Sequence, residues 1–173
     1  MKKIVLFGAG KSATYLIEFL ISEGVLNNWQ LTVCDADLAL AQSKIGHSQN
    51  AKAVSINVEN ELERKKIISN ADIVISMLPP VLHFLIAKDC VDQNKNLLTA
   101  SYADENIQSL KNEIDKKGLL FLCEMGLDTG IDHMSAMKII DSIKNKGGKI
   151  TSFQSHCGGL IAPESDDNPW HYK

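Results

Sequence analysis

The sequence lacks the features that mark several specialised classes of protein. It has no apolar run long enough for a membrane span, and its apolar start breaks at Gly8 instead of continuing as a signal-peptide core. The four cysteines are too widely spaced for a zinc knuckle or a redox pair. A net charge of −3 gives no broad electrostatic footprint for nucleic acid or an anionic membrane. We therefore expect a cytoplasmic protein with reduced cysteines and a small-molecule partner.

Strand-length apolar runs alternate with helix-length segments along the chain. The expected strands are Lys3–Phe7, Leu31–Cys34, Ala53–Ile56, Ile73–Met77, Asn96–Thr99 and Leu119–Cys123. The expected helices are Lys11–Glu23, which Gly24 would end, Leu38–Lys44, Glu61–Ser69, Leu82–Asp92, Asn106–Lys117 and Ile131–Lys146. This alternation predicts an α/β fold, in which a doubly wound parallel sheet carries helices on both faces. Lys149–Ser155 would then form one more strand.

A glycine-rich turn joins the first expected strand to the first expected helix. Its sequence is Gly8-Ala9-Gly10-Lys11-Ser12-Ala13, in the context that a dinucleotide-binding fingerprint requires. Gly8 permits a tight turn, Gly10 lets the backbone approach a pyrophosphate, and the small Ala13 lets helix and strand pack closely. The start of the helix offers free amide donors to the phosphates. The motif predicts a Rossmann-type domain that binds a dinucleotide, and the alternative is a glycine turn without a ligand.

Asp35 closes the second expected strand, in the position of the acidic residue of the fingerprint. A carboxylate there can accept hydrogen bonds from both hydroxyls of an adenosine ribose and would repel a 2′-phosphate. We therefore expect NAD(H) as the cofactor, with Asp35 and Ala36 at its ribose. NADP(H) is the alternative, because Lys11 or Lys44 could lie near a phosphate. A solvated turn residue is the alternative for Asp35.

Further candidates lie where the later strands end, at the edge where open α/β sheets bind ligands. They are Asn57 and Val58 after the third strand, Ser76 and Leu78 at the fourth, and Ser101 and Tyr102 after the fifth. Val58 and Leu78 would flank the adenine and the nicotinamide-side ribose, or else serve only in packing. Ser101 and Tyr102 are expected near the nicotinamide, as substrate-binding residues.

Several motifs from about Val74 onward occur in a distinctive order and spacing. They are Val74-Ile75-Ser76-Met77-Leu78-Pro79, Thr99-Ala100-Ser101-Tyr102, Glu124-Met125-Gly126-Leu127-Asp128-Thr129-Gly130-Ile131-Asp132-His133, Gly147-Gly148-Lys149, Cys157–Glu164 and Asp167–Lys173. In these motifs the chain resembles the saccharopine dehydrogenase family, and more specifically the saccharopine reductases of lysine metabolism. The resemblance implies a Rossmann domain followed by a substrate and dimerisation domain. It also implies an oxidoreductase that transfers a hydride at a C–N bond of saccharopine or a related adduct, and a homodimer in the full-length protein.

The resemblance also implies a division of the chain. In the family, Tyr172-Lys173 would lead directly into the second domain. We therefore expect a nucleotide-binding domain over residues 1–148 and the start of a truncated substrate domain over residues 149–173, with the fragment alone inactive. A related amine dehydrogenase, acting on a carboxynorspermidine or homospermidine type of substrate, is one alternative. A stand-alone dinucleotide-binding module without catalysis is the other.

Departures from the family pattern bear on the site. Fungal members that use NADP carry Cys-Arg where this chain has Asp35-Ala36, which agrees with the expectation of NAD. Lys11-Ser12 replace apolar residues of the glycine turn and leave its backbone contacts available. Thr129 replaces the proline of the usual Gly-Leu-Asp-Pro-Gly motif, which leaves Asp128 in a less rigid loop.

Few residues are candidates for proton transfer. By resemblance, Leu127 and Asp128 lie at the cofactor cleft, and Asp128 is the candidate acid or base, with capping of the following helix as its alternative. His133 falls in the first turn of that helix, where a packing or surface role is more typical. The other histidines, His83 among them, show no pairing with cysteines or carboxylates that suggests a metal. Cys157 is interpreted as a small buried thiol.

Overall fold

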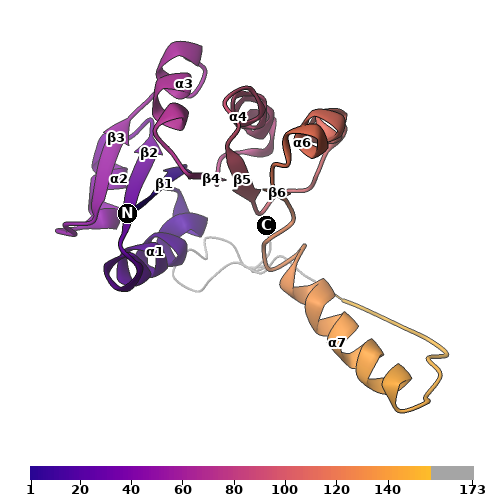
Figure 1. Cartoon of the computed structure of the whole chain (residues 1–173). Coiled ribbons are helices and arrows are strands. Elements are labelled where there is room, and N and C mark those ends of the chain that lie inside the picture. Colours follow the sequence, from indigo (N-terminus) through magenta and orange to yellow (C-terminus); the bar gives the residue numbers. More distant parts are fainter. Residues whose placement is uncertain (157–173) are drawn as a thin grey trace, which may run out of the picture. The chain divides into compact units, whose positions relative to one another are not determined.

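A computed structural model describes residues 1–156, in which strands and helices alternate (Figure 1). The strands are β1 (Lys2–Phe7), β2 (Trp29–Asp35), β3 (Ala51–Ser55), β4 (Ile73–Ser76), β5 (Asn96–Thr99) and β6 (Phe121–Leu122). The helices are the 3₁₀ turn η1 (Lys11–Ala13), α1 (Thr14–Asn27), α2 (Leu38–Ile45), α3 (Glu61–Ser69), α4 (Pro80–Asp92), α5 (Glu105–Ser109), α6 (Lys111–Lys117) and α7 (Ile131–Asn145). Cys157 and the motifs after it lie outside the described residues.

The six strands form one parallel sheet in the order β3-β2-β1-β4-β5-β6. β1 lies at the centre, where Ile4 pairs with Leu31 of β2 on one side and with Ile73 of β4 on the other. The chain first adds strands on one side of β1 and then on the other, so β1 and β4 flank the point where the strand order reverses. Ligands of open α/β sheets bind at the carboxyl end of such a point. The predicted Rossmann-type parallel sheet is confirmed.

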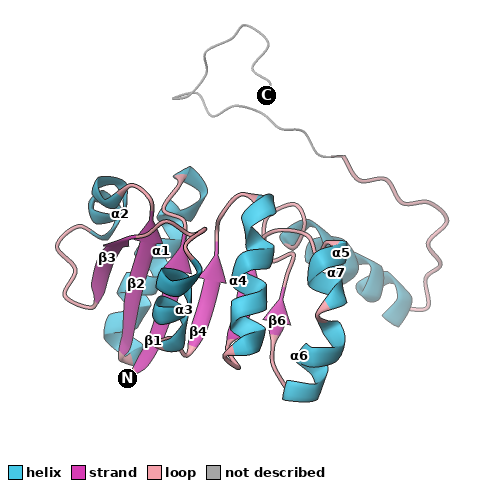
Figure 2. Ribbon diagram, turned by 90° about the horizontal axis from the view of Figure 1, so that it is seen from above, coloured by secondary structure: helices cyan, strands magenta, loops and turns pink. Residues whose placement is uncertain are grey.

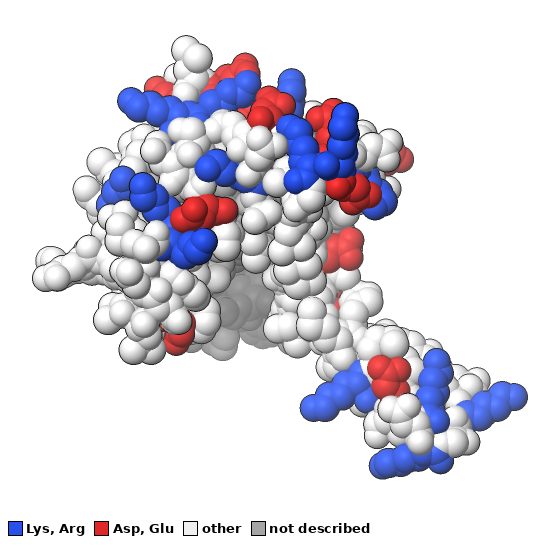
Figure 3. Space-filling model, viewed as in Figure 1, with Lys and Arg blue, Asp and Glu red and all other residues white. Residues whose placement is uncertain are grey.

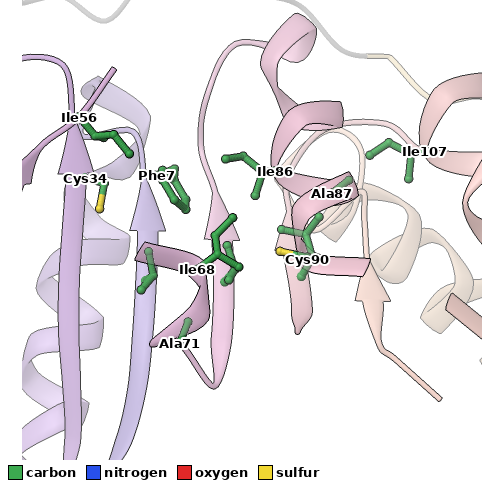
Figure 4. Packing of buried hydrophobic residues seen from close by; sticks show 12 residues of the cluster. Phe7, Cys34, Ile56, Ile68, Ala71, Ile86, Ala87, Cys90 and Ile107 are labelled. Carbon is green, nitrogen blue, oxygen red and sulfur yellow. The ribbon is translucent and has the colours of Figure 1, made fainter. Parts of the chain in front are cut away.

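Alternate residues of β1 to β5 enter two separate hydrophobic cores, one on each face of the sheet. Ile4 and Leu6 of β1 point to the face covered by α1 and α2, whereas Val5 and Phe7 point to the face covered by α3 and α4. Figure 2 shows the latter two helices in front of the sheet, and Figure 4 shows the core beneath them. This period of two is expected for strands that are buried on both faces.

Charged side chains join α3 to α4. Arg64 and Asp89 form an ion pair that is only 5% and 1% exposed, with 2.5 Å between Arg64 Nε and Asp89 Oδ2. The Nη1 group of Arg64 also donates to the Val58 carbonyl at 2.6 Å. At the surface, Lys65 lies 3.5 Å from Asp92. Figure 3 shows acidic and basic side chains intermixed over these helices. The buried pair therefore fixes both helices and the loop that follows β3.

The first helix is longer than expected. Gly24 lies inside α1, which continues to Asn27 and ends where Asn28 takes a left-handed conformation with φ 57°. A Cβ atom on Gly24 would collide with the side chain of Asn50, whose amide donates to the Ile21 carbonyl at 2.9 Å. The prediction that Gly24 ends the helix is wrong, because this glycine allows a close approach between α1 and the residue before β3.

Two other segments differ from expectation. The helix predicted over 106–117 is divided at Leu110, whose amide donates to the Ile107 carbonyl at 3.1 Å in a tight turn that ends α5. The strand predicted over Lys149–Ser155 is absent from the described residues. Residues 151–156 are exposed, and no strand among residues 1–156 lies beside them as the hydrogen-bonded neighbour that a strand needs.

The chain separates into two compact units, Met1–Gly130 and Ile131–Lys173. The first contains the whole sheet. In the second, α7 buries none of its side chains, and Ile131, Met134 and Ile139 are exposed. The expected division after residue 148 stays a prediction. Within residues 1–156, the helices are too short or too polar to cross a membrane.

Candidate functional site

The glycine turn lies between the end of β1 and the start of η1. Gly8 has φ +98°, and a Cβ atom there would lie 2.8 Å from the Met77 carbonyl oxygen, so only glycine fits. Its amide donates to the Cys34 carbonyl at 2.8 Å, which joins the turn to β2. Gly10 is exposed, with no atom within 4 Å of its missing Cβ. Ala13 is fully buried against the sheet. The turn therefore presents open backbone on one side and close packing on the other.

Asp35 supports this turn from the neighbouring strand. Its Oδ2 accepts a hydrogen bond from the Ala9 amide at 2.6 Å, and its Oδ1 accepts one from the Asp37 amide at 3.0 Å. Asp37 in turn caps α2 by accepting from the Leu40 amide. Both oxygens of Asp35 are thus engaged with the protein's own backbone.

A cleft of about 800 Å³ opens at the carboxyl ends of β1–β4, beside the glycine turn. Its lining residues are Phe7, Gly8, Gly10, Cys34, Asp35, Ala36, Ser55, Ile56, Asn57, Val58, Glu59, Met77, Leu78, Pro79 and Leu82. The volume lies within the usual range for small-molecule sites, and apolar walls with a few polar groups are typical of them. The open space at Gly10 is the feature that a pyrophosphate against the backbone requires. The residues present therefore fit a dinucleotide.

Sequence reasoning found about half of this lining. Its members Gly8, Gly10, Asp35, Ala36, Asn57, Val58 and Leu78 were predicted as cofactor-binding residues. Lys11 and Ser12 are exposed on η1 next to the cleft, without lining it. Lys44 donates to the Thr14 hydroxyl at 2.6 Å and so joins α2 to α1. Ile56 and Leu82 are among the lining residues that were missed, although each borders a segment whose position at the sheet edge was recognised.

Ser76 lies beneath the cleft and contacts a histidine that the sequence did not single out. The Ser76 hydroxyl is fully buried and lies 2.7 Å from Nδ1 of His83, in the second turn of α4. On the other side of the ring, Nε2 lies 2.7 Å from the Ser101 hydroxyl. Thr99 Oγ1 lies 3.5 Å from Nδ1 and accepts from the Ser101 amide at 3.2 Å. Burial lowers the pKa of His83, with the charge of Asp104 opposing in part, which favours a neutral ring.

The loop after β6 is tied to the residues that follow β5. The Glu124 amide donates to the Ser101 carbonyl at 2.9 Å. Leu127 and Asp128 are exposed and do not line the cleft, and Tyr102 is 65% exposed. The Thr129 hydroxyl is buried and has no hydrogen-bond partner among residues 1–156. The proposed roles of Tyr102, Leu127 and Asp128 stay predictions.

The described cysteines are free thiols, of which Cys34 and Cys90 are buried. Burial raises the pKa of Cys34 to about 12, with Lys52 lowering it and Asp35 raising it to smaller extents. Burial also raises the pKa values of Cys90 and Cys123. Cys34 lines the cleft as a protonated, unreactive side chain.

Known proteins match both parts of the chain. Residues 4–122 match the family model described as the saccharopine dehydrogenase NADP binding domain, and residues 126–173 match the saccharopine dehydrogenase C-terminal domain. A saccharopine dehydrogenase (NADP(+), L-glutamate-forming) of Saccharomyces cerevisiae is 37% identical, over 99% of this chain and 38% of the relative. The mitochondrial alpha-aminoadipic semialdehyde synthase of Mus musculus is 36% identical, over 99% of this chain and 18% of the relative. The chain thus spans well under half the length of these relatives.

Solved structures agree with the sequence comparison. The apo saccharopine dehydrogenase (L-Glu forming) of S. cerevisiae superposes with a TM-score of 0.87 at 37% identity, covering 100% of this chain and 38% of the other. A putative myo-inositol dehydrogenase from Sinorhizobium meliloti superposes with a TM-score of 0.62 at 15% identity, covering 83% of this chain and 42% of that one. The second likeness shows the fold alone.

The expectation of NAD(H) is wrong. The family model that matches the sheet is that of an NADP-binding domain, and the yeast relative is named as NADP(+)-dependent. The physical reason lies in Asp35, which was interpreted as a receptor for the ribose hydroxyls. In the structure each oxygen of its carboxylate already accepts a backbone amide, from Ala9 or Asp37, so this residue supports the glycine turn whether or not a ribose is bound. The acidic residue at the end of the second strand is accounted for by its support of the turn, and its presence alone does not decide between NAD and NADP.

Proposed function

Because the chain belongs to the saccharopine dehydrogenase family, we propose that it is the NADP-binding part of an oxidoreductase that transfers a hydride at a C–N bond of saccharopine, in lysine metabolism. The observation that carries this proposal is the cleft at the strand-order reversal, with its open backbone at Gly10, in a chain whose two parts both match saccharopine dehydrogenase domains. The related amine dehydrogenases and the non-catalytic module are less well supported, because neither is named by those two family models.

We assign the lining residues to the parts of the cofactor. The backbone of Gly8 and Gly10 would hold the pyrophosphate, and Asn57 and Val58 would contact the adenosine. Among residues 1–156, the lining of this cleft includes no lysine or arginine. Lys11 is then the basic side chain proposed for the 2′-phosphate, because it is exposed beside Gly10 whereas Lys44 is bonded to Thr14.

We propose that the substrate binds beside the residues that follow β5. The nicotinamide, when bound, supplies the hydride chemistry, so the protein's task is to bind and orient. Ser101 and Tyr102 would contact the substrate, and Asp128 stays the candidate acid or base. A homodimer of the full-length protein and a cytoplasmic location also stay predictions.

Titration of the purified chain with NADPH and NADH tests the proposal. We expect tighter binding of NADPH, and we expect Lys11→Ala to reduce this preference by about tenfold, or about 1.4 kcal/mol. Gly10→Leu should abolish binding of both nucleotides while leaving thermal unfolding unchanged, because its side chain would occupy open space. Equal binding of NADH and NADPH by the wild-type chain would contradict the assignment. Saccharopine-dependent reduction of NADP+ by the 173 residues alone would contradict the proposal that they supply the NADP-binding part of the enzyme.

A further inference from the structure

His83 lies in a chain of hydrogen bonds that runs from the interior of the sheet to its carboxyl edge. Ser76 at the end of β4 is fully buried, His83 is 4% exposed, and Ser101 after β5 is only half-buried. The imidazole contacts one serine hydroxyl with each nitrogen, both at 2.7 Å. The outer end of this hydrogen-bond series is therefore the hydroxyl of Ser101 at the edge of the sheet. The nicotinamide end of the cofactor and the substrate are proposed to lie at this edge.

The hydroxyls around Nδ1 determine which nitrogen carries the proton. Ser76 and Thr99 both approach Nδ1, at 2.7 and 3.5 Å. If Nδ1 carried a hydrogen, the nearer hydroxyl, that of Ser76, would have to accept it. Within residues 1–156 the Ser76 proton would then have no acceptor, and an unmade hydrogen bond in a buried place is costly. The arrangement is satisfied when Ser76 donates to an unprotonated Nδ1, so the neutral ring carries its hydrogen on Nε2.

This tautomer determines what Ser101 can offer to a ligand. With the hydrogen on Nε2, His83 donates to the oxygen of Ser101. The Ser101 amide is separately bonded to Thr99, which holds the backbone of the residue in place. The hydroxyl hydrogen of Ser101 is then not used by the ring and is available to an acceptor outside the protein.

From this geometry we propose that His83 is a positioning residue, which holds Ser101 as a hydrogen-bond donor toward an acceptor oxygen of the bound ligand. Two oxygens at the nicotinamide end have the required chemistry: the carboxamide carbonyl of the cofactor and a carboxylate of the substrate. The proposal rests on the proposed function only for the identity of the ligand, since the hydrogen-bond chain is present in the protein itself.

The first test needs no ligand. Long-range ¹H–¹⁵N correlation spectra of the histidine-labelled chain report the tautomer of each ring, and His83 is assigned by the signal that is lost in His83→Asn. We expect a neutral ring with its hydrogen on Nε2 at pH 7. A ring protonated on Nδ1, or on both nitrogens, would overturn the proposal whether or not the chain binds NADPH.

The second test uses a matched pair of substitutions. The amide nitrogen of His83→Gln can reach the position of Nε2 and keep the bond to Ser101, whereas the shorter side chain of His83→Asn can replace only Nδ1. We expect His83→Asn and Ser101→Ala to weaken ligand binding by about tenfold and His83→Gln by about twofold or less, as for one lost hydrogen bond. The double variant His83→Asn/Ser101→Ala should bind no more weakly than Ser101→Ala. A role confined to packing would instead give equal losses in His83→Asn and His83→Gln.

The probes separate the two sources of the acceptor. A loss seen with NADPH but not with 2′,5′-ADP, which lacks the nicotinamide, identifies the carboxamide. A loss seen only when saccharopine is added to the NADPH complex identifies the substrate carboxylate. The absence of a loss with both probes would overturn the proposal. Failure of the proposed function looks different, because the wild-type chain would then bind neither NADPH nor 2′,5′-ADP.

Discussion

Removal of one partner from the buried ion pair between α3 and α4 should be among the most destabilising single changes in the domain. Asp89→Asn leaves the Arg64 guanidinium with no carboxylate, in a position only 5% exposed. An uncompensated buried charge of this kind costs about 3–5 kcal/mol. For a domain of this size the loss corresponds to a fall of about 6–20 °C in the unfolding midpoint.

The same pair should be replaceable as a unit. Arg64→Met/Asp89→Leu removes both charges together, and apolar residues of similar volume are often neutral at such sites. The bond from Arg64 to the Val58 carbonyl is then lost without replacement, at about 1 kcal/mol. The 3.9 Å contact between Lys65 and Asp89 is lost as well, but Lys65 keeps Glu61 and Asp92 as partners. The double variant should therefore be more stable than Asp89→Asn by about 2–4 kcal/mol, the difference between these two estimates.

Urea denaturation followed by circular dichroism measures these differences. Lys111→Met is the control, because it breaks an ion pair with Asp115 in which both side chains are mostly exposed, and such pairs contribute less than about 1 kcal/mol. The reasoning would be refuted if Asp89→Asn were destabilised by no more than this control. It would equally fail if the double variant were less stable than Asp89→Asn.

Three further changes test individual features of the fold. Gly8→Ala should destabilise the chain by about 1 kcal/mol or more, because φ is +98° and the new Cβ would press on the Met77 carbonyl oxygen. Thermal unfolding measures this loss, and an unchanged midpoint would contradict the geometry of the turn. Thr129→Val removes a buried hydroxyl that has no partner in the described part of the chain, and should raise stability by about 1 kcal/mol. The control Thr99→Val loses a bonded hydroxyl and should lower stability. A loss of stability in both variants would refute the distinction. The amide of Lys3 donates to Asp72 at 2.7 Å, and this bond lowers the pKa of the Asp72 carboxyl. The bond therefore stabilises the fold at a pH above the pKa of the unfolded state, and the stabilisation is lost as the pH falls through the lower pKa of the folded state. Asp72→Asn should accordingly be less stable than the wild type near pH 7 and approach it in acid, and a difference independent of pH would exclude this linkage.

The sheet could be predicted because its signals are local. Apolar runs bounded by turn residues predicted the ends of each strand to within a few residues. The glycine turn predicted which edge of the sheet binds a ligand. The helix ends were harder. Glycine is common at helix ends, so Gly24 was predicted to end the helix. The contact with Asn50, which explains why a glycine is needed there, joins residues far apart in the chain.

The chemistry of the site was less predictable than its place. His83 was set aside because it has no cysteine or carboxylate nearby in the sequence, yet its partners are the hydroxyls of Ser76, which ends β4, and Ser101, which follows β5. A search for a polar residue in the first turns of a helix that follows a serine-ended strand could have found it. For Asp35 the error was of the opposite kind. Its place in the motif was recognised correctly, but its hydrogen bonds to the amides of Ala9 and Asp37 could not be predicted from the motif.

The position of Asp35 has a consequence for how cofactor preference can change in this fold. One carboxylate links the turn expected to bind the phosphates to the strand end expected to lie beside the ribose, through its bond to the Ala9 amide. An engineer who replaces Asp35 to alter the ribose side of the cleft would therefore also loosen the turn. Affinity and folding would change together, and a compensating substitution in the turn would be needed before the effect on specificity could be measured alone.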